Sequence, residues 1–457
     1  MRIPLEIFKA YDIRGLVPGQ LSPDLARSIG RAFIEYLGAK TIAIGRDMRE
    51  SSPTLASAFT EGATAGGAAV VDGGMITTDM LYFAVPRYQL DGGAVITASH
   101  NPKEYNGVKL VREGAAALSG DAGIKEIKEW LLAGRQFESR SPAPKVQKDI
   151  LGDYVTHVRR FISPEAIRPL HVVMDAANGM AGAVAPAVFA DLPLKKTELY
   201  FEPDGSFPHH EPNPLLEENR RTVVNRVLAE QADLGIAWDG DADRCFFVDD
   251  TGEYVPGDFL TALLGEAFLL KEPGAVIIYD VRASWAVKET LEALGGRPLI
   301  NRVGHAFFKQ RMRKERALFG GEVSGHYYFR DNYYADNGMI PALLILELMS
   351  KKRKRLSELL APLRQKYFIS GEINSTVDDM EAVMDRLRKR YADGHISKLD
   401  GLSVDYPDWH FNVRPSNTEP LLRLNLEARR AEEMTRRRDE VLAIIRDAQP
   451  NPSPRQP

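Results

Sequence analysis

The chain has 457 residues, of which 44% are hydrophobic and 27% are charged, and its formal net charge is −4. This length predicts about three or four domains, and the composition is that of an ordinary globular protein. A near-neutral charge balance excludes a general electrostatic affinity for nucleic acid, so an anionic ligand has to be bound by a local basic cluster.

The N-terminus and the cysteine content indicate the compartment. Charged side chains interrupt residues 1–10, so no signal-peptide core is predicted there. The most apolar later segments, residues 259–270 and 339–349, each contain a glutamate and are too short to span a bilayer. Cys245 is the single cysteine, which excludes a disulfide framework. We expect a cytoplasmic protein without a membrane part, with Cys245 as a buried packing residue.

The first clear helix is predicted over residues 25–37. Ser22 and Pro23 form a typical helix start, with an N-cap side chain followed by proline in the first turn. Large apolar residues then recur every four positions from Leu25 to Leu37. Gly38 is a typical C-cap and ends the predicted helix.

Strands alternate with helices along most of the chain, beginning with a short β-branched strand at residues 41–45. This alternation predicts a parallel α/β sheet. Two kinds of strand then recur, one leading into a polar turn and one ending in a loop rich in functional groups. The first kind covers residues 42–47, 172–179 and 276–282, and the second covers residues 94–102, 234–244 and 317–326. We interpret this as a structural repeat of three α/β units whose loops lie at the carboxyl ends of strands, where α/β proteins bind ligands.

The pattern changes after about residue 370 to that of a smaller α+β module. Strands are predicted at residues 372–377, 410–413 and 421–426, and helices at residues 378–391 and 430–447. The proline-rich tail is predicted to be disordered. The predicted domains therefore cover residues 1–147, 148–253, 254–367 and 368–449, followed by a tail at residues 450–457.

The sequence Ser99-His100-Asn101-Pro102 directly follows an apolar strand. A serine at a strand end can act as a nucleophile or as a carrier of a phosphoryl group. A polar turn stays open as the alternative. A serine hydrolase is disfavoured because the G-x-S-x-G element is absent, and adjacent residues rarely let a histidine act as base on the serine.

The run Asp239-Gly240-Asp241-Ala242-Asp243-Arg244 places three carboxylates at alternate positions after another apolar strand. Their mutual repulsion predicts a bound cation, and hard oxygen ligands select Mg²⁺ or a similar ion. An EF-hand is excluded because its sixth position, a glycine, is Arg244 here, and its twelfth, a glutamate, is Asp250. A solvated acidic turn is the alternative.

Two further loops combine groups that suit a sugar phosphate. Glu322 and Ser324, in a glycine-rich loop that ends at His326, can exchange hydrogen bonds with vicinal hydroxyls. The loop at residues 414–420 offers Arg414 with hydroxyl and amide groups that can bind a phosphate dianion. Each loop alone could equally be a turn. No complete Walker A or G-x-G-x-x-G element is present, which disfavours nucleotide-dependent phosphoryl transfer.

Two other features have simpler interpretations. His209 and His210 are of the type that binds metals, yet they lie in a proline-rich loop far along the chain from the acidic cluster, so we expect surface or cleft-lining residues. The basic run at residues 351–355 is expected to be a solvated helix end, where positive charge is favourable.

The four loops in this order, with Tyr11-Asp12-Ile13-Arg14-Gly15 near the start, resemble the α-D-phosphohexomutase superfamily over nearly the whole chain. The likeness is to the phosphomannomutase/phosphoglucomutase branch. It implies three related mixed α/β domains and a smaller C-terminal α+β domain, heart-shaped around a central cleft. In chain order, the four domains would contribute a phosphoserine loop, a Mg²⁺ loop, a sugar loop and a phosphate loop.

The resemblance also implies residue roles. Ser99 would be the phosphoserine, and its phosphate would bind Mg²⁺ together with Asp239, Asp241 and Asp243. Other catalytic residues would be Arg14, His100, Lys109 and His305, with Lys109 and His305 as candidate proton shuttles and the lysine pKa lowered by cationic surroundings. The implied substrate-binding residues are Tyr11, Arg244, Arg282, Glu322, Ser324, His326, Arg414, Ser416, Asn417 and Thr418.

The implied reaction interconverts hexose 1-phosphate and hexose 6-phosphate through a bound hexose 1,6-bisphosphate, which would also serve as activator. Partners would be small hexose phosphates only, and the enzyme would be a monomer. The apolar Val323 in the sugar loop favours mannose and glucose phosphates, although Arg282 stands where that branch often has lysine. A phosphoglucosamine mutase and a catalytically silent sugar-phosphate-binding protein are the alternatives.

Overall fold

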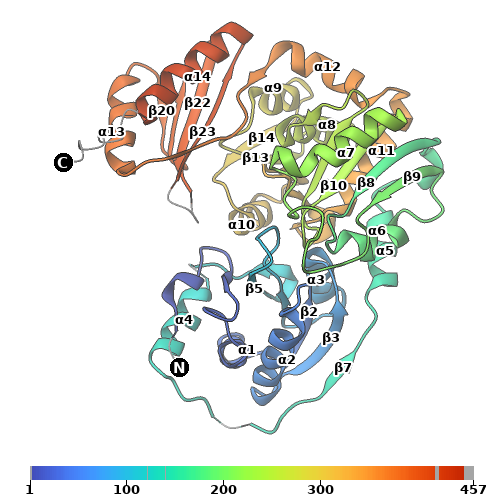
Figure 1. Cartoon of the computed structure of the whole chain (residues 1–457), viewed down its shortest axis with the longest axis vertical. Coiled ribbons are helices and arrows are strands. Elements are labelled where there is room, and N and C mark those ends of the chain that lie inside the picture. The colour runs from blue at the N-terminus through green and yellow to red at the C-terminus, as the bar shows by residue number, and fades with distance from the viewer. Residues whose placement is uncertain (1–2, 121, 139, 417–420, 447–457) are drawn as a thin grey trace, which may run out of the picture. The chain divides into compact units, whose positions relative to one another are not determined.

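The computed structural model describes residues 3–120, 122–138, 140–416 and 421–446 (Figure 1). The chain forms two compact units, Met1–Val255 with Gly304–Ser357, and Pro256–Val303 with Glu358–Pro457. The predicted third domain, residues 254–367, therefore contributes to both units. Among the described residues, no helix is both long and apolar enough to cross a membrane.

The first sheet of unit 1 has the strand order β1-β5-β4-β2-β3-β7, with β6 beside β5. Strand β2 is parallel to β3 and β4, while β4 pairs antiparallel with β5. The bounds are β1 Ile13–Leu16, β2 Thr41–Arg46, β3 Ala69–Met75, β4 Gly92–Ile96, β5 Tyr105–Arg112, β6 Ala116–Ala117 and β7 Lys145–Gln147, with helices α1 Pro23–Leu37, α2 Ser52–Ala65, α3 Thr78–Arg87 and α4 Ile124–Leu132.

The predicted helix ends at α1 are confirmed. The Ser22 hydroxyl accepts a hydrogen bond from the Leu25 amide at 3.3 Å, and Gly38 adopts the left-handed conformation at φ 63° that a C-cap requires. The apolar face of the helix packs with α2 and the sheet, and Phe33 and Phe59 are fully buried in that core. Strand β4, from which the Ser99 loop leaves, lies inside this sheet between β5 and β2.

The second sheet of unit 1 repeats the pattern in the order β12-β11-β10-β8-β9. Strand β8 is parallel to β9 and β10, and β10 pairs antiparallel with β11. The β8–β12 bounds are Leu170–Asp175, Leu194–Leu199, Leu234–Trp238, Cys245–Asp249 and Tyr254–Val255, with helices α5 Leu151–Arg159, α6 Ala181–Val188 and α7 Glu217–Glu230. The parallel neighbours of β2 and β8 support the predicted repeat.

The third group of strands follows the same plan. In unit 2, β13 is parallel to β14, and in unit 1, β15 pairs antiparallel with β16, which pairs with β17. The unit 1 bounds are β15 Phe319–Gly321, β16 Tyr327–Phe329, β17 Ala335–Asp336, α10 His305–Glu315 and α11 Met339–Lys352. Those of unit 2 are β13 Val276–Asp280, β14 Arg297–Asn301, α8 Gly257–Lys271 and α9 Trp285–Ala293, followed by α12 Leu356–Lys366, whose first two residues belong to unit 1.

The C-terminal part of unit 2 is an antiparallel sheet in the order β18-β23-β22-β21-β20, with β19 beside β23. Helices α13 and α14 lie beside this sheet (Figure 1). Val383 and Ile445, on these helices, belong to the buried apolar core that the sheet shares. The β18–β23 bounds are Phe368–Ile369, Ile373–Thr376, His395–Ser397, Leu402–Asp405, Trp409–Pro415 and Leu421–Ala428, and the helices are α13 Met380–Arg390 and α14 Ala431–Arg446.

The predicted α+β character of this module is confirmed. The short strands β18, β20 and β21 were not predicted, because runs of two to four residues give little periodic signal. The predicted disordered tail, residues 450–457, lies outside the described residues. Together the parts match the predicted fold class of three related α/β regions and an α+β region.

Candidate functional site

Ser99 follows β4 in a tight loop of unit 1. Its backbone is in the left-handed region at φ 53°, a conformation that costs a non-glycine residue about 1–3 kcal/mol unless its surroundings hold it. The Ser99 amide donates to the Thr97 hydroxyl at 2.9 Å, and its Oγ donates to Asp239 Oδ2 at 2.8 Å. The hydroxyl is thereby directed at the acidic loop.

The acidic loop follows β10 and approaches the Ser99 loop closely. A Cβ on Gly240 would lie 2.4 Å from the Ser99 carbonyl oxygen, so glycine is required for the two loops to meet. Asp239, Asp241 and Asp243 are all buried, and one carboxylate oxygen of each lies within 4.8 Å of the others. The structure thus brings the predicted nucleophile and the three predicted metal ligands together.

Two cations partly neutralise the three carboxylates. Lys109, from β5, places its Nζ 2.6 Å from Asp241 and 2.7 Å from Asp243. The Arg244 guanidinium lies 2.7 Å from Asp239, and its Nη2 is 3.3 Å from Ser99 Oγ. One negative charge is left over within this group of buried side chains, which favours a further cation.

The pKa values follow from these neighbours. Burial raises the pKa of Asp239 to about 6, against the opposing effect of Arg244. Burial acts in the same direction on Asp241, but Lys109 outweighs it and lowers the pKa of that carboxyl. Burial alone would lower the pKa of Lys109, yet the two aspartates raise it. The expected lysine with a lowered pKa is therefore wrong for this arrangement, because the nearest charges are anionic.

The donor set fits Mg²⁺. Two carboxylate oxygens, Asp241 Oδ1 and Asp243 Oδ1, are buried and have no hydrogen-bond donor among the described residues. Such oxygens are costly to bury unless they bind a cation. Mg²⁺ prefers oxygen ligands and keeps open positions for water or phosphate oxygens. The group can therefore hold a metal ion.

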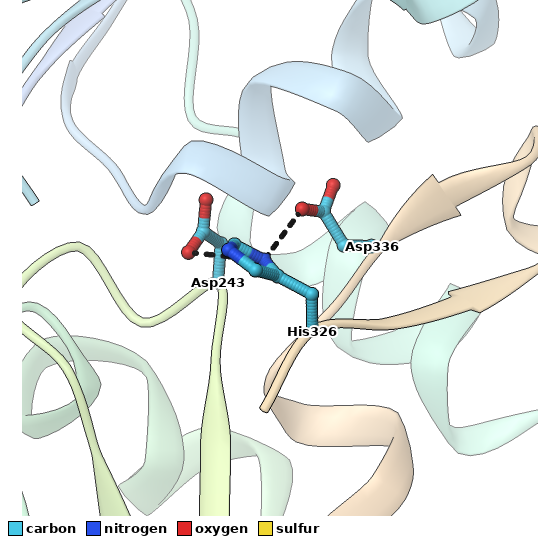
Figure 2. Close-up of side chains that lie close together, drawn as sticks. All are labelled: Asp243, His326 and Asp336. Atoms are coloured by element: carbon cyan, nitrogen blue, oxygen red, sulfur yellow. Dashed lines mark ion pairs between the residues drawn. The ribbon is translucent and has the colours of Figure 1, made fainter. Parts of the chain in front are cut away.

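His326, which follows the sugar loop, lies beside two carboxylates from other segments (Figure 2). Its Nδ1 is 2.9 Å from Asp336 and 3.8 Å from Asp243. Burial would lower the pKa of His326, but Asp243 and Asp336 raise it. These three residues also have metal-ligand spacing, yet Lys309 Nζ lies 2.7 Å from Asp336 and already neutralises it. We interpret this cluster as an ion-pair network.

The sugar loop is a tight turn between β15 and β16. The Glu322 carboxylate is buried and accepts hydrogen bonds from the Tyr328 hydroxyl at 2.5 Å and from the Gly304 amide at 2.9 Å. Ser324 is half-buried at the tip of the turn. The structure therefore fixes Glu322 firmly before any ligand binds.

Tyr11 and His305 lie next to this group, with their ring centroids 5.3 Å apart. His305 is in turn 6.1 Å from His326, again between ring centroids. Burial lowers the pKa of His305, and Lys309 adds to that effect. Its buried Nδ1 has no hydrogen-bond partner among the described residues. These surroundings favour the neutral imidazole, which has one ring nitrogen without a proton.

Arg14 and His100 complete the predicted set in unit 1. Arg14, on β1, donates to the Asn101 side chain and pairs with Asp12. His100 Nδ1 lies 3.2 Å from Ser99 Oγ and also accepts from Arg244. Burial and Arg244 lower the pKa of His100. His100 therefore lies beside the serine, but the Arg244 contact and the lowered pKa disfavour it as the base for Ser99, as expected for adjacent residues.

Unit 2 holds the predicted residues Arg282 and Arg414 in a basic cluster around Glu372. Glu372 Oε2 is 3.1 Å from Arg282 and 3.6 Å from Arg414, and its Oε1 is 3.1 Å from Arg423. Arg282 also pairs with the buried Asp280 at 2.8 Å. Three guanidinium groups thus share two carboxylates. Burial and Arg282 lower the pKa of Arg414, against the opposing effect of Glu372.

The rest of the predicted phosphate loop is only partly described. Ser416 Oγ accepts a hydrogen bond from Arg423 Nη2 at 3.1 Å, which links it to the basic cluster. The other two predicted residues, Asn417 and Thr418, lie outside the described residues.

Among the described residues, neither His209 and His210 nor Cys245 belongs to a group with metal-ligand spacing. His209 is exposed and stacks on Tyr200, and His210 pairs with Asp175 at 3.2 Å. Cys245 is buried, as predicted. The basic run at residues 351–355 is exposed at the end of α11, also as predicted.

Several residues of these clusters were missed by the sequence analysis. Thr78 donates to Asp241 at 2.5 Å from the first turn of α3. The others reach their partners only through folding, and they have no motif of their own: Lys309, Asp336, Glu372 and Arg423. In the sequence, Glu372 is a single acid at the start of a predicted strand. Such a residue is too common to identify a site.

Comparisons with known proteins identify the family of this chain. The chain matches the family models of phosphoglucomutase/phosphomannomutase alpha/beta/alpha domains I, II and III at residues 5–136, 152–252 and 256–367. The C-terminal domain of that family matches residues 372–444.

Individual proteins are similar over nearly the whole chain. The phosphohexose mutases of Xanthomonas campestris pv. campestris are 44% identical over 93% of this chain and 95% of theirs. The phosphomannomutase of Salmonella typhimurium is 44% identical with the same coverage of both chains. A phosphoglucomutase/phosphomannomutase family protein of Burkholderia thailandensis, solved by crystallography, has a TM-score of 0.88 at 35% identity and covers 98% of this chain and 99% of its own.

Proposed function

The chain belongs to the phosphoglucomutase/phosphomannomutase family and is a phosphohexomutase, and on that premise we propose that Ser99 carries the phosphoryl group in the interconversion of mannose and glucose 1- and 6-phosphates. The observation that carries this proposal is the Ser99 hydroxyl, 2.8 Å from Asp239 within a cluster of three buried aspartates. A serine held at a cation site can accept and return a phosphoryl group.

The proposed reaction has two transfers. In the first, the bond from phosphorus to Ser99 Oγ breaks and a bond to the free hydroxyl oxygen of a hexose monophosphate forms. The sugar hydroxyl gives up a proton, and Ser99 Oγ takes one. The resulting hexose 1,6-bisphosphate turns over and returns its other phosphoryl group to Ser99. His305, whose surroundings favour the neutral imidazole, is the proposed acceptor of the sugar proton.

Asp239, Asp241 and Asp243, together with the phosphate on Ser99, would hold Mg²⁺. When bound, this cation neutralises negative charge that spreads over the transferring phosphoryl group. Lys109 and Arg244 supply further positive charge from fixed positions, 2.6 Å from Asp241 and 2.7 Å from Asp239. Such fixed charges stabilise a transition state without reorganising. His100 and Arg14 would position the Ser99 loop through Ser99 Oγ and Asn101.

The remaining proposed roles concern binding. Glu322, Ser324, His326 and Tyr11 would contact the sugar, and the basic cluster of unit 2 would bind the phosphate that does not react. The proposed ligands of that phosphate are Arg282, Arg414, Ser416, Asn417 and Thr418. The apolar Val323 in the sugar loop and the phosphomannomutase names of the relatives support mannose and glucose over an amino sugar.

The proposal also covers the activator, the cellular location and the oligomeric state. Hexose 1,6-bisphosphate would act as activator, because it phosphorylates Ser99 in chains that have lost the group. A single buried cysteine supports a reducing, cytoplasmic location, and we propose that the enzyme works as a monomer.

A substrate panel tests the proposal. The chain would be assayed with Mg²⁺, a trace of glucose 1,6-bisphosphate, and the 1-phosphates of mannose, glucose and glucosamine side by side. We expect turnover of the mannose and glucose compounds. Preferred turnover of the amino sugar would overturn the proposed substrate, and no turnover of any of them would overturn the activity.

A further inference from the structure

Arg49 binds the backbone of the Ser99 loop at four carbonyl oxygens. It lies in the loop between β2 and α2, and its side chain is only 1% exposed. Its Nη1 donates to the carbonyls of Pro102 at 2.7 Å and Tyr105 at 3.0 Å, and its Nη2 donates to those of Ser99 at 2.9 Å and Asn101 at 2.6 Å. One side chain thus binds both sides of the turn that presents the serine.

The Arg49 side chain is itself held in place. Its Nε lies 3.2 Å from Asp47 Oδ2, and its guanidinium lies over the Phe207 ring, 5.1 Å from the centroid. The Asp47 amide donates to the Ile96 carbonyl at 2.9 Å, at the end of β4. The arginine is therefore anchored to the strand that leads into the loop.

The Ser99 loop needs such an anchor because its backbone is strained. Ser99 has φ 53°, and a non-glycine residue keeps a left-handed conformation only where its surroundings determine it. A guanidinium offers five N–H donors in a fixed plane, whereas a lysine ammonium offers three on a flexible stem. Arginine is thus the side chain whose geometry suits four carbonyls at once.

We propose that Arg49 is a positioning residue that holds the Ser99 loop in the geometry required for phosphoryl transfer. The inference rests on the proposed role of Ser99 as the phosphoryl carrier. Arg49 donates to backbone oxygens, whereas Arg244 is the arginine near Ser99 Oγ, at 3.3 Å. Arg49 therefore acts in the same way whether Ser99 bears a phosphoryl group or a hydroxyl. Losing it should slow both half-reactions by a similar factor.

Arg49→Lys tests this directly. Phosphorylation of Ser99 by glucose 1,6-bisphosphate and its discharge by hexose monophosphate would each be timed by intact-mass measurement. We expect both rates to fall about 100-fold, the effect of a reacting atom misplaced by about 1 Å, while KM for hexose phosphate changes little. Unchanged rates, or a rise in KM with kcat intact, would overturn the inference.

Arg313→Lys is the matched control. Arg313 also donates to backbone carbonyls of unit 1, those of Gly114, Tyr333 and Lys309, at 2.7–3.1 Å. We expect this variant to unfold at a lower temperature while both half-reactions keep their rates. An equal loss of rate in the control would mean that the Arg49 effect is only that of a destabilised fold.

Phe207→Leu covers the case in which Arg49→Lys does not fold, because it removes the aromatic face and leaves the carbonyl contacts in place. Hydrogen exchange of the peptide around residues 97–106 is the second readout, and we expect faster exchange there, together with a severalfold loss in both half-reactions. Wild-type exchange and rates in this variant would overturn the inference. A wild-type chain that takes up no phosphoryl group would instead overturn the proposed function.

Discussion

The acidic cluster of unit 1 and the basic cluster of unit 2 are built in opposite ways. In unit 1, three buried aspartates face Lys109 and Arg244, and one negative charge is left over. In unit 2, the guanidinium groups of Arg282, Arg414 and Arg423 converge on the carboxylate of Glu372. Buried charges are costly unless paired, so the first cluster favours a cation and the second an anion.

This difference explains how a chain with a formal charge of −4 can handle a dianionic substrate. In the proposed scheme, the acidic cluster holds the metal and the reacting phosphoryl group, and the basic cluster holds the phosphate that does not react. Each cluster carries opposite charges of its own, Lys109 in one and Glu372 in the other, which keep the side chains in place. Changing single members of each cluster can test this assignment.

The largest effect is expected from Asp241→Asn. The change removes a negative charge and one of the buried oxygens without a donor. We therefore expect the Mg²⁺ concentration for half-maximal activity to rise at least about tenfold, as for other mutations at metal sites. Maximal turnover should fall as well. The measurement is a Mg²⁺ titration of initial rates with a check of folding by circular dichroism.

Asp233→Asn is the control for that change, because Asp233 precedes β10 while the acidic loop follows it. Its carboxylate accepts from the His171 amide at 2.7 Å, so its loss should affect stability only. An Asp241→Asn enzyme with unaltered Mg²⁺ dependence would contradict the metal assignment.

Arg414→Ala is expected to act on KM alone, without the loss of maximal turnover. A charge-assisted hydrogen bond to phosphate contributes about 1.5–3 kcal/mol, so KM for hexose phosphate should rise about ten- to hundredfold. The Mg²⁺ dependence should stay that of the wild type, because Arg414 belongs to the basic cluster of unit 2 and not to the acidic cluster. Steady-state kinetics at saturating Mg²⁺ measures this, with Arg388→Ala, which pairs with Asp385 outside the cluster, as control. A changed Mg²⁺ dependence with unchanged KM would break the distinction between the clusters.

The smallest effect is expected from Glu372→Gln, and it depends on pH. Burial would raise the pKa of Glu372, but Arg282, Arg423 and Arg414 hold it at about 2, below the ordinary value of about 4.3. The ion pairs therefore stabilise the fold above about pH 4, and this stabilisation is lost as the pH falls towards 2. The variant should lose about 2 kcal/mol at pH 7 and about half of that at pH 3.

Thermal unfolding of both chains at pH 7 and pH 3 measures that difference. The same variant should bind inorganic phosphate more tightly at pH 7, because three guanidinium groups then share one carboxylate fewer. Equal unfolding temperatures at pH 7, or weaker phosphate binding, would show that Glu372 is not the counter-ion of this cluster.

How much the sequence could predict depends on how locally each feature is encoded. Helix α1 was predictable because its cap residues and apolar spacing all lie within residues 22–38. The acidic loop was predictable because Asp239, Asp241 and Asp243 are close neighbours in the chain. Glu372 lies 90 residues from Arg282 in the sequence, so only folding brings this pair together.

The electrostatics were less predictable than the positions of the residues. Lys109 was expected among cations, but β5 places it between two aspartates, which reverses the expected direction of its pKa. Arg49 lies in an ordinary polar loop, and its importance follows only from the four carbonyls around it. Such long-range contacts leave no local pattern in a single sequence.

The central claim is that Ser99, beside the acidic cluster, carries the phosphoryl group. Intact-mass measurement of the chain after treatment with glucose 1,6-bisphosphate and Mg²⁺ tests it most directly, with peptide mapping to locate the modification. We predict one added phosphoryl group on Ser99, which mannose or glucose monophosphate removes, and no added group on Ser99→Ala. A wild-type chain that turns over substrate without ever bearing this group, or an active Ser99→Ala enzyme, would contradict the account.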